Sequence, residues 1–237
     1  MEVRSHLLYD GGQVKFVATP HLSAGINTRQ YIIIHYTGGT TFMSGVWWHS
    51  DPKAKVSAHL HLGREGEIIQ MAAFDRIAWH AGVSEWKGLT SLNRYSIGIE
   101  LQNTGSQEYT ETQLNELVDV CKALVTAYPT IKEILGHSDI SPGRKADPGK
   151  QFPMEWLRDQ VFGNGKVKPE RPATGVAQTM VTTANLNLRE YPSMSARVFD
   201  TLPKGTEVKI LQRGSGWNEV FVCKNSLRGW VSSQYLK

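Results

Sequence analysis

The segment Tyr31–His35, with the sequence YIIIH, constrains the fold of this 237-residue chain more than any other stretch. It is a continuous apolar run rich in β-branched residues, and such a run is typical of a strand that is buried on both faces. A second strand is predicted at Tyr95–Leu101. Because strands of this kind occur where helices cover a sheet, the two segments predict an α/β domain.

The segment between Thr110 and Pro129 predicts the longest helix. Thr110 and Gln113 have the spacing of a capping box, the apolar residues that follow recur with a 3.6-residue period, and Pro129 ends the pattern. Another helix is predicted from Pro153 onward, because proline is well tolerated in a first helical turn. A short helix and a β-hairpin complete the predicted elements of this part: 42–50, and 56–62 with 67–71.

A change of pattern near residue 163 divides the chain. Residues 163–175, GNGKVKPERPATG, are dominated by Gly, Pro and charged residues without periodicity, which is typical of a linker. Beyond them, short strand patterns alternate with turn residues at regular spacing, and this predicts a small all-β barrel. We therefore expect a larger domain at 1–162, a linker at 163–175 and a smaller domain at 176–237.

The net charge of +4 is concentrated in the second of these domains. Residues 174–237 contain eight Lys/Arg and four Asp/Glu, whereas the preceding residues contain 18 of each. A basic accessory module favours a polyanionic partner such as an anionic cell wall. No run of five Lys/Arg occurs anywhere, so we expect no nucleic-acid partner.

Composition also bears on location. No stretch approaches the ~18 consecutive apolar residues of a membrane span, so no membrane insertion is expected. The first ten residues lack the apolar core of a secretory signal. We therefore expect a cytoplasmic protein, unless lysis or a dedicated export route releases it to the cell wall. Cys121 and Cys223 fall in different predicted domains, which argues against a disulfide framework.

The segment 136–149, GHSDISPGRKADPG, carries the densest chemistry. Two Pro-Gly pairs predict a tightly turned loop that can aim the side chains of His137, Lys145 and Asp147 at one point. His35 lies at the carboxyl end of its predicted strand, where open α/β sheets gather ligands. Two histidines and a carboxylate suit a zinc ion that keeps a fourth position for water. A rival pair, His59 and His61 on one strand face, could also ligate metal, although packing explains it as well.

Five blocks in order now support a resemblance: IIIHYT, VSAHLHLGREGEIIQ, AWHAGVS, YSIGIELQN and GHSDISPGRKADPG. Residues 30–156 resemble the type-2 N-acetylmuramoyl-L-alanine amidases, the zinc family that includes cytosolic recycling enzymes and phage amidases and shares its fold with the peptidoglycan recognition proteins. The resemblance implies a mixed central sheet flanked by helices and hydrolysis of the amide between N-acetylmuramic acid and L-alanine. It implies one zinc ion held by His35, His137 and Asp147, with Lys145 and Glu100 as catalytic residues.

The same resemblance suggests substrate contacts. Arg64 and Arg144 would bind substrate carboxylates, a use that suits the guanidinium group, and Trp79 and His80 would line the groove. The expected partner is peptidoglycan or a muropeptide, with the chain acting as a monomer.

The C-terminal part resembles bacterial SH3-type domains through LNLREYPSMSARVFDTLPKGTEVKILQRGSGWNEVFV and GWVSSQYL. Such domains bind cell-wall peptides, and Trp217 and Tyr235 are the candidate contacts here. A tethered wall-binding module would favour polymeric peptidoglycan as the substrate. Two alternatives stay open: a non-catalytic peptidoglycan recognition protein, and a zinc peptidase that cuts within the stem peptide.

Overall fold

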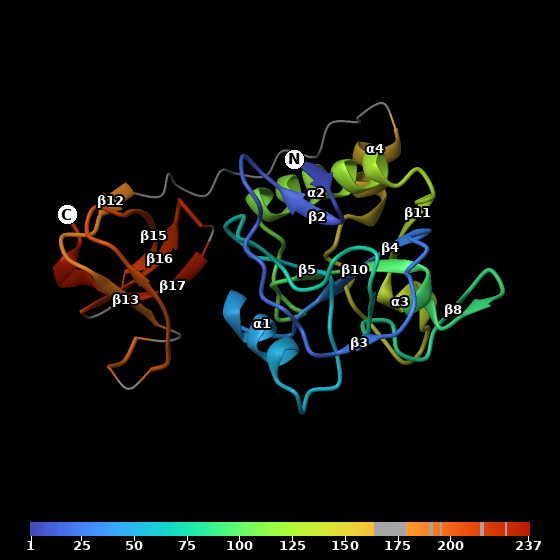
Figure 1. Ribbon diagram of the computed structural model, residues 1–237, viewed down its shortest axis with the longest axis horizontal. Helices are drawn as coiled ribbons and strands as arrows, with labels where there is room; N and C mark the ends of the chain where they lie inside the picture. Colours follow the sequence, from blue (N-terminus) through green and yellow to red (C-terminus); the bar gives the residue numbers. More distant parts are fainter. Residues whose placement is uncertain (164–178, 190–191, 195, 214–215, 226) are drawn as a thin grey trace. The chain divides into compact units, whose positions relative to one another are not determined.

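The computed structural model describes residues 1–163, 179–189, 192–194, 196–213, 216–225 and 227–237 (Figure 1). The chain divides into two compact units, Met1–Glu170 and Arg171–Lys237. Apart from Gly163, the predicted linker at 163–175 lies outside the described residues. The predicted domain boundaries therefore stay a prediction.

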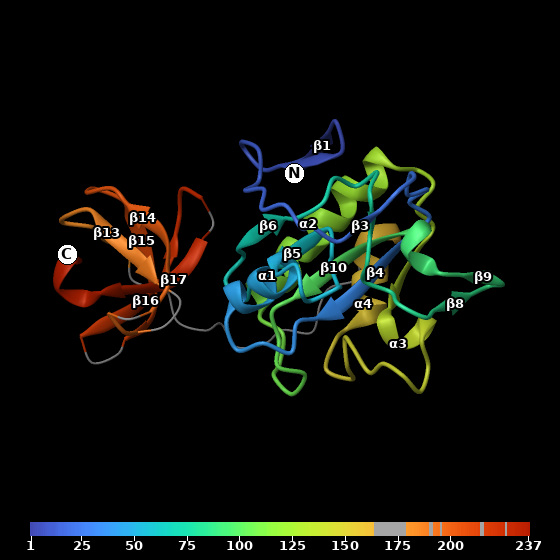
Figure 2. The same cartoon turned by 60° about the horizontal axis from the view of Figure 1, so that its bottom comes forward.

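A five-stranded mixed sheet forms the centre of the first unit. In spatial order its strands are β11 (Glu133–Gly136), β4 (Tyr31–Tyr36), β10 (Ser96–Leu101), β5 (Leu60–Leu62) and β6 (Ile68–Gln70). Figure 1 labels β11, and Figure 2 labels the other four. The first four are parallel to one another, and β6 runs antiparallel to β5 as the second arm of a hairpin. The predicted α/β class, the mixed sheet and the buried strand at β4 are confirmed.

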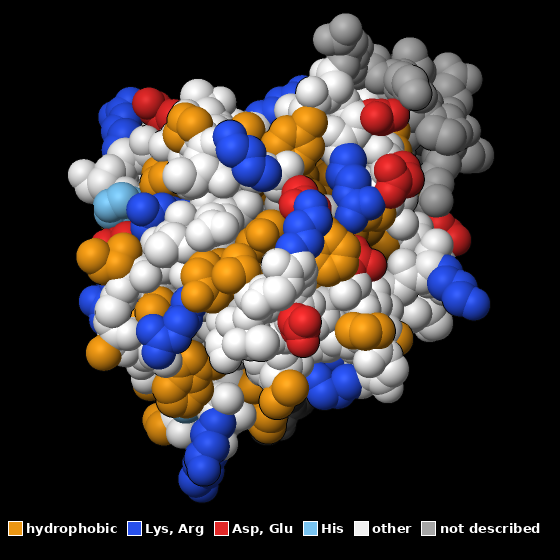
Figure 3. All heavy atoms as spheres, turned by 90° about the vertical axis from the view of Figure 1, so that its right-hand side faces the viewer, with side chains coloured by type: hydrophobic (Ala, Val, Ile, Leu, Met, Phe, Trp, Pro, Cys, Tyr) orange, Lys and Arg blue, Asp and Glu red, His pale blue; other side chains and the backbone are white. Residues whose placement is uncertain are grey.

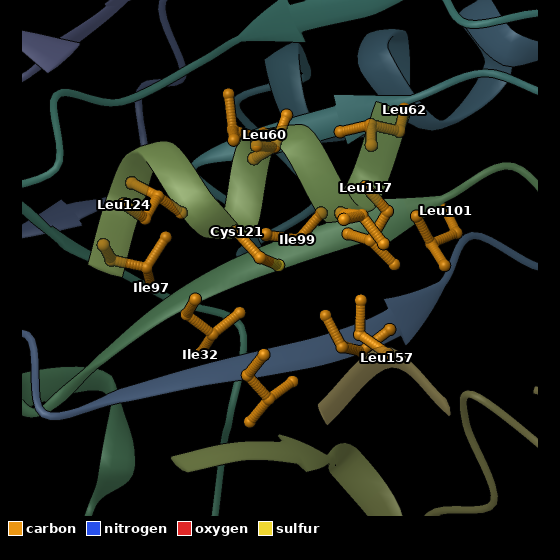
Figure 4. Close-up of a cluster of buried hydrophobic side chains, with 14 of the residues drawn as sticks. Ile32, Leu60, Leu62, Ile97, Ile99, Leu101, Leu117, Cys121, Leu124 and Leu157 are labelled. Atoms are coloured by element: carbon orange, nitrogen blue, oxygen red, sulfur yellow. The ribbon is translucent and has the colours of Figure 1, made fainter. Parts of the chain in front are cut away.

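Two helices cover one face of this sheet: α2 (Glu111–Ala127) and α4 (Met154–Phe162). The Thr110 hydroxyl accepts a hydrogen bond from the Gln113 amide at 3.1 Å and begins α2 as predicted. Figure 4 shows the apolar stripe of α2 facing the strands, with Leu117 and Cys121 fully buried among them. Burying these side chains is the main stabilising contribution on this face of the sheet.

The opposite face of the sheet carries the polar chemistry. Ile33 of β4 packs with Leu135 and Ile140 on this face, and His35 points to the same side because side chains alternate along a strand. Strand register places Glu100 of β10 beside His35, and His61 of β5 beside Glu100. Three titratable side chains therefore stand in a row near the carboxyl end of the sheet.

Short elements complete the first unit: β1 (Glu2–Arg4), β2 (Leu7–Tyr9), β3 (Leu22–Ser23), α1 (Phe42–Ser50), β7 (Ile77–Ala78), β8 (Glu85–Trp86), β9 (Leu89–Thr90), η1 (Leu92–Arg94) and α3 (His137–Ile140). The helix predicted at 42–50 is confirmed as α1. Residues 79–93, which the sequence predicts as a loop, contain the β8–β9 hairpin, and the loop predicted at 136–149 contains α3. Elements of two to four residues are too short to show a periodic pattern.

The described residues of the second unit form β-strands, connecting turns and one short turn of helix. Its strands are β12 (Thr179–Val181), β13 (Leu186–Arg189), β14 (Val198–Leu202), β15 (Glu207–Arg213), β16 (Trp217–Val222) and β17 (Leu227–Ser232), followed by η2 (Ser233–Tyr235). They pair antiparallel in the order β12-β15-β16-β17-β13-β14. Fully buried Leu188, Val208, Val220 and Val231 supply its core, which confirms the predicted all-β architecture.

Across the described ranges, no helix combines the length and apolarity that crossing a bilayer requires. On the face seen in Figure 3, Lys/Arg side chains alternate with Asp/Glu and with small hydrophobic patches. This face therefore presents no large patch of a single charge sign.

Candidate metal centre

Three side chains from three segments converge at the carboxyl end of β4. The Nδ1 atoms of His35 and His137 lie 3.0 Å apart, and Oδ2 of Asp147 lies 3.0 Å from each of them. All three residues are buried, with 2%, 3% and 7% of their surface exposed. In the described part of the chain they form the only group of three or more His, Cys, Asp or Glu residues that could hold a metal ion.

Backbone geometry explains the convergence. The parallel pairing of β11 with β4 sets Gly136 opposite Ile34, so the residues that follow each of them, His137 and His35, become neighbours. The Ser138 amide donates to the main-chain oxygen of Asp147 at 2.9 Å and ties the far end of the loop to α3. One strand pairing therefore brings together two histidines that are 102 residues apart in the sequence.

The charges at the centre favour a cation. Burial lowers the pKa of His35 to about 4, so its imidazole is neutral at pH 7 and has one nitrogen lone pair to offer. Burial alone would raise the pKa of Asp147, but the contacts with His137 and His35 outweigh it and hold that pKa below its ordinary value. The result is one ionised carboxylate oxygen facing two imidazole nitrogens.

The outer nitrogen of His137 provides a test of whether the three residues suit a metal ion. Nε2 of His137 lies 3.1 Å from the main-chain oxygen of Ala81. A carbonyl oxygen can only accept, so this contact favours a hydrogen on Nε2, which leaves the lone pair of a neutral ring on Nδ1. Nη2 of Arg144, which can only donate, lies farther from Nε2, at 3.3 Å. The group thus has the donor set and the outer hydrogen bonding of a zinc site.

A pocket of about 450 Å³ opens onto these three residues. Glu100 and Lys145 both line it. Oε2 of Glu100 is buried and has no hydrogen-bond partner among the described residues. Burial, with a smaller contribution from the negative charge of Asp147, raises the pKa of Glu100 to about 8, while Lys145 acts in the opposite direction. The pocket therefore combines a carboxyl group that can exchange protons near neutrality with an ammonium group.

The predicted substrate-contact residues fall into two groups. Trp79, His80 and Arg144 line the pocket, whereas Arg64 does not. Arg64 lies at the turn between β5 and β6, where its guanidinium donates to the main-chain oxygen of Glu108 at 2.8 Å. Its substrate contact stays a prediction, as do those of the other three.

Arg144 and His80 also have partners within the protein. Nη2 of Arg144 donates to the main-chain oxygens of Ala81 and Val83, both at 2.8 Å. Nδ1 of His80 lies 3.1 Å from Nε2 of His35. These two side chains therefore support the wall of the centre, a position that their sequence motifs alone did not indicate.

Two residues of the pocket escaped the sequence analysis. Trp48 and His49, near the end of α1, also line it, and 57% of the Trp48 surface is exposed. The sequence does not distinguish a tryptophan that lines a pocket from one that packs in the core. Only the structure shows that Trp48 lines the pocket.

The rival histidine pair is divided between two environments. Nε2 of His59 bonds the main-chain oxygen of Arg76 at 2.9 Å, and Nδ1 accepts from the Gly98 amide at 3.0 Å. His61 instead contacts His49, with 3.0 Å between Nε2 and Nδ1. His59 therefore has no nitrogen free for a metal ion, and packing accounts for the pair.

Comparison with known proteins agrees with this geometry. The sequence profile of the N-acetylmuramoyl-L-alanine amidases matches residues 26–150, more than half of the chain. The chain belongs to this amidase family. The bacterial SH3 domain profile matches residues 184–237, which fits the antiparallel sheet of the second unit.

The individual relatives are also named as amidases. The 1,6-anhydro-N-acetylmuramyl-L-alanine amidase AmpD of Escherichia coli (strain K12) is 48% identical over 109 residues, 46% of this chain and 58% of the relative. AmpD of Haemophilus influenzae is 34% identical over 175 residues, 65% of this chain and 94% of the relative. The chain thus spans little more than half the length of the E. coli relative.

Some of the similar solved structures contain a muropeptide. One of them is the complex of the E. coli N-acetylmuramyl-L-alanine amidase AmiD with anhydro-N-acetylmuramic acid-L-Ala-D-gamma-Glu-L-Lys. It is 33% identical to this chain, with a TM-score of 0.53 and 60% of each chain covered. The central sheet and its flanking helices are thus those of a type-2 amidase.

Proposed function

We propose that this protein is a zinc-dependent amidase that hydrolyses the bond between the lactyl group of N-acetylmuramic acid and L-alanine in peptidoglycan or muropeptides. The observation that supports this most strongly is the set of three ligand atoms 3.0 Å apart at the floor of a pocket that Glu100 and Lys145 also line. A bound zinc ion would polarise the scissile carbonyl and lower the pKa of a water molecule beside it.

Glu100 is the proposed general base. Its carboxylate takes a proton from the attacking water while the water oxygen bonds to the carbonyl carbon. It then delivers that proton to the nitrogen of L-alanine as the carbon–nitrogen bond breaks. A pKa of about 8 suits a group that must gain and lose a proton near neutral pH.

Lys145 is the proposed stabiliser of the negative charge that develops on the carbonyl oxygen. Its ammonium group belongs to the pocket wall, two residues before the Asp147 ligand. A positive charge held in advance where an oxyanion forms lowers the barrier without reorganisation during the reaction.

Mass spectrometry of digests tests the proposal. Intact sacculi and soluble anhydro-muropeptides are each incubated with the protein as prepared, after chelation, and after zinc is added back. Release of an intact stem peptide that begins with L-alanine, lost on chelation and restored by zinc, is expected. Cleavage between stem residues would instead indicate a zinc peptidase, and binding without any product would indicate a non-catalytic recognition protein.

The second unit is proposed to hold the enzyme on the cell wall. Trp217 begins β16 and pairs with Ser232 at the end of β17, and the Ser233 amide donates to the main-chain oxygen of Gly216 at 3.1 Å. Tyr235, with 40% of its surface exposed, follows in η2 close to this pairing. Trp217 and Tyr235 therefore belong to neighbouring segments of the backbone, and we propose that both contact a wall peptide.

Substitution within the full chain tests the wall contact. Trp217→Ala and Tyr235→Ala should lower the fraction of protein that sediments with purified cell walls while cleavage of small muropeptides continues. Met194→Ala, which removes a side chain that is 75% exposed in the same unit, is the matched control. Equal sedimentation of all three variants and the parent would remove Trp217 and Tyr235 from the proposal.

A further inference from the structure

The outer nitrogen of His35 is held by another histidine. Nε2 of His35 lies 3.1 Å from Nδ1 of His80, and the two rings meet edge to face with centroids 5.2 Å apart. Nε2 of His80 lies 3.4 Å from the main-chain oxygen of Ser96 and 3.3 Å from its hydroxyl, a longer and shared contact. These contacts form a chain that leads from β10 to the candidate metal centre.

The groups at the outer end of this chain favour one arrangement of its hydrogen atoms. The main-chain oxygen of Ser96 can only accept, and the Ser96 hydroxyl donates its hydrogen to the main-chain oxygen of Leu92 at 2.6 Å. These contacts therefore favour a hydrogen on Nε2 of His80. His80 is 8% exposed, and with the hydrogen on Nε2 the lone pair of its imidazole lies on Nδ1, the atom that faces His35.

The same reasoning applies to the hydrogen on His35. Because Nδ1 of His80 accepts, Nε2 of His35 donates. The neutral His35 ring then presents its remaining lone pair from Nδ1, the atom that faces His137 and Asp147. The outer contacts of His35 therefore favour the tautomer that can bind a cation.

The main chain around His80 fixes the ring in place. A Cβ atom at Gly98 would lie 2.4 Å from Cγ of His80, so the imidazole packs directly against the backbone of β10 where only glycine fits. The amides of His80 and Ala81 both donate to Oδ1 of Asn93, at 3.0 and 2.7 Å. The main-chain oxygen of Ala81 in turn contacts Nε2 of His137 at 3.1 Å.

We propose that His80 is a positioning residue that fixes the tautomer and ring orientation of His35, so that residues 80 and 81 together preorganise both histidines for the metal ion. This inference rests on the proposed function only in taking zinc as the ion. It assigns His80 an outer role, in which it supports a ligand and does not itself bind the metal.

The dissociation constant for zinc, measured on the full chain by competition with a chromophoric chelator, tests this role. His80→Leu and His80→Asn have side chains of similar size, but only the amide oxygen of asparagine can accept the hydrogen of His35 Nε2. We expect His80→Leu to bind zinc about 10- to 100-fold more weakly and His80→Asn to recover most of that loss. His6→Leu, which alters a half-buried histidine that bonds the Tyr128 hydroxyl and does not line the pocket, should leave the constant unchanged.

Imidazole NMR of the metal-free parent provides a second readout, which does not require any variant to fold. The hydrogen on His35 should reside on Nε2 and exchange slowly with solvent. A hydrogen on Nδ1, or equal zinc affinities for His80→Leu and His80→Asn, would overturn the inference. A parent protein that binds no zinc would instead overturn the proposed function, so the two failures are distinguishable.

Discussion

Two clusters on the same side of the sheet, each a pair of buried histidines, differ in whether a carboxylate lies between the two rings and in the hydrogen bonds of those rings. At the candidate metal centre, His35 and His137 share the carboxylate of Asp147. In the second cluster, Nε2 of His61 lies 3.0 Å from Nδ1 of His49. Among the described residues, no carboxylate joins these two histidines to make a metal-binding group of three. Nδ1 of His61 is buried without a hydrogen-bond partner among those residues.

The difference shows that proximity of histidines is a weak indicator of metal binding. Burial lowers the pKa of His49 to about 4 and that of His61 well below its ordinary value, as it does for His35. All three rings are thus neutral at pH 7 and could ligate. Only the first cluster adds a negative charge and a hydrogen-bonded outer nitrogen on each ring, and these are the features that hold a divalent cation.

The largest effect is expected from removing the carboxylate that distinguishes the clusters. Asp147→Ala should lower zinc affinity by more than the ~100-fold that loss of an outer support costs, and should abolish amide hydrolysis with it. The matched change His61→Ala should leave one bound zinc per chain. Metal analysis after dialysis measures both, and retention of zinc by Asp147→Ala would break the comparison.

The next effect separates metal binding from proton transfer. Glu100→Gln removes the proposed base but keeps the size of the side chain, so zinc should stay bound while turnover falls by about 10²- to 10⁴-fold. Initial rates on a soluble muropeptide, with zinc content measured on the same sample, provide the test. Near-normal turnover would mean that another group accepts the proton.

A third prediction concerns the stability of the metal-free protein. Because the folded pKa of Glu100 is raised to about 8 from 4.5, the carboxyl costs nothing below pH 4.5 and destabilises the fold increasingly as pH rises toward 8. The free energy of unfolding of the parent, relative to Glu100→Gln, should therefore fall by about 3 kcal/mol between pH 4.5 and pH 7. Urea titrations at both pH values measure this; a constant difference would contradict the raised pKa.

The smallest effect sharpens the account of the second cluster. The pKa of His49 is depressed in the folded state, so its contribution to stability is present above pH 6.5 and is lost as pH falls toward 4. In His49→Gln, the loss of unfolding free energy between pH 7 and pH 5.5 should be smaller than in the parent by about 1 kcal/mol. An unchanged acid slope would show that His49 is not buried as a neutral ring.

Regular elements were predictable because each has a local pattern. The apolar run of β4, the periodic face of α2 and the short helix at 42–50 all lie where the sequence indicated. The sequence also singled out His35, His137 and Asp147, through a family resemblance more than through spacing. The hairpin β8–β9 and the four-residue α3 were missed because neither is long enough to repeat a pattern.

The amino-acid sequence by itself determined the α/β class of the first unit, the all-β class of the second and the residues able to form a metal centre. Only the tertiary structure decided which nitrogen of His35 and of His137 faces that centre. The orientation of His35 depends on His80, 45 residues away in the chain, and that of His137 on Ala81, 56 residues away. It also decided that Arg144 supports the wall of the pocket. Hydrogen-bond direction is a property of assembled neighbours, and no local sequence pattern carries it.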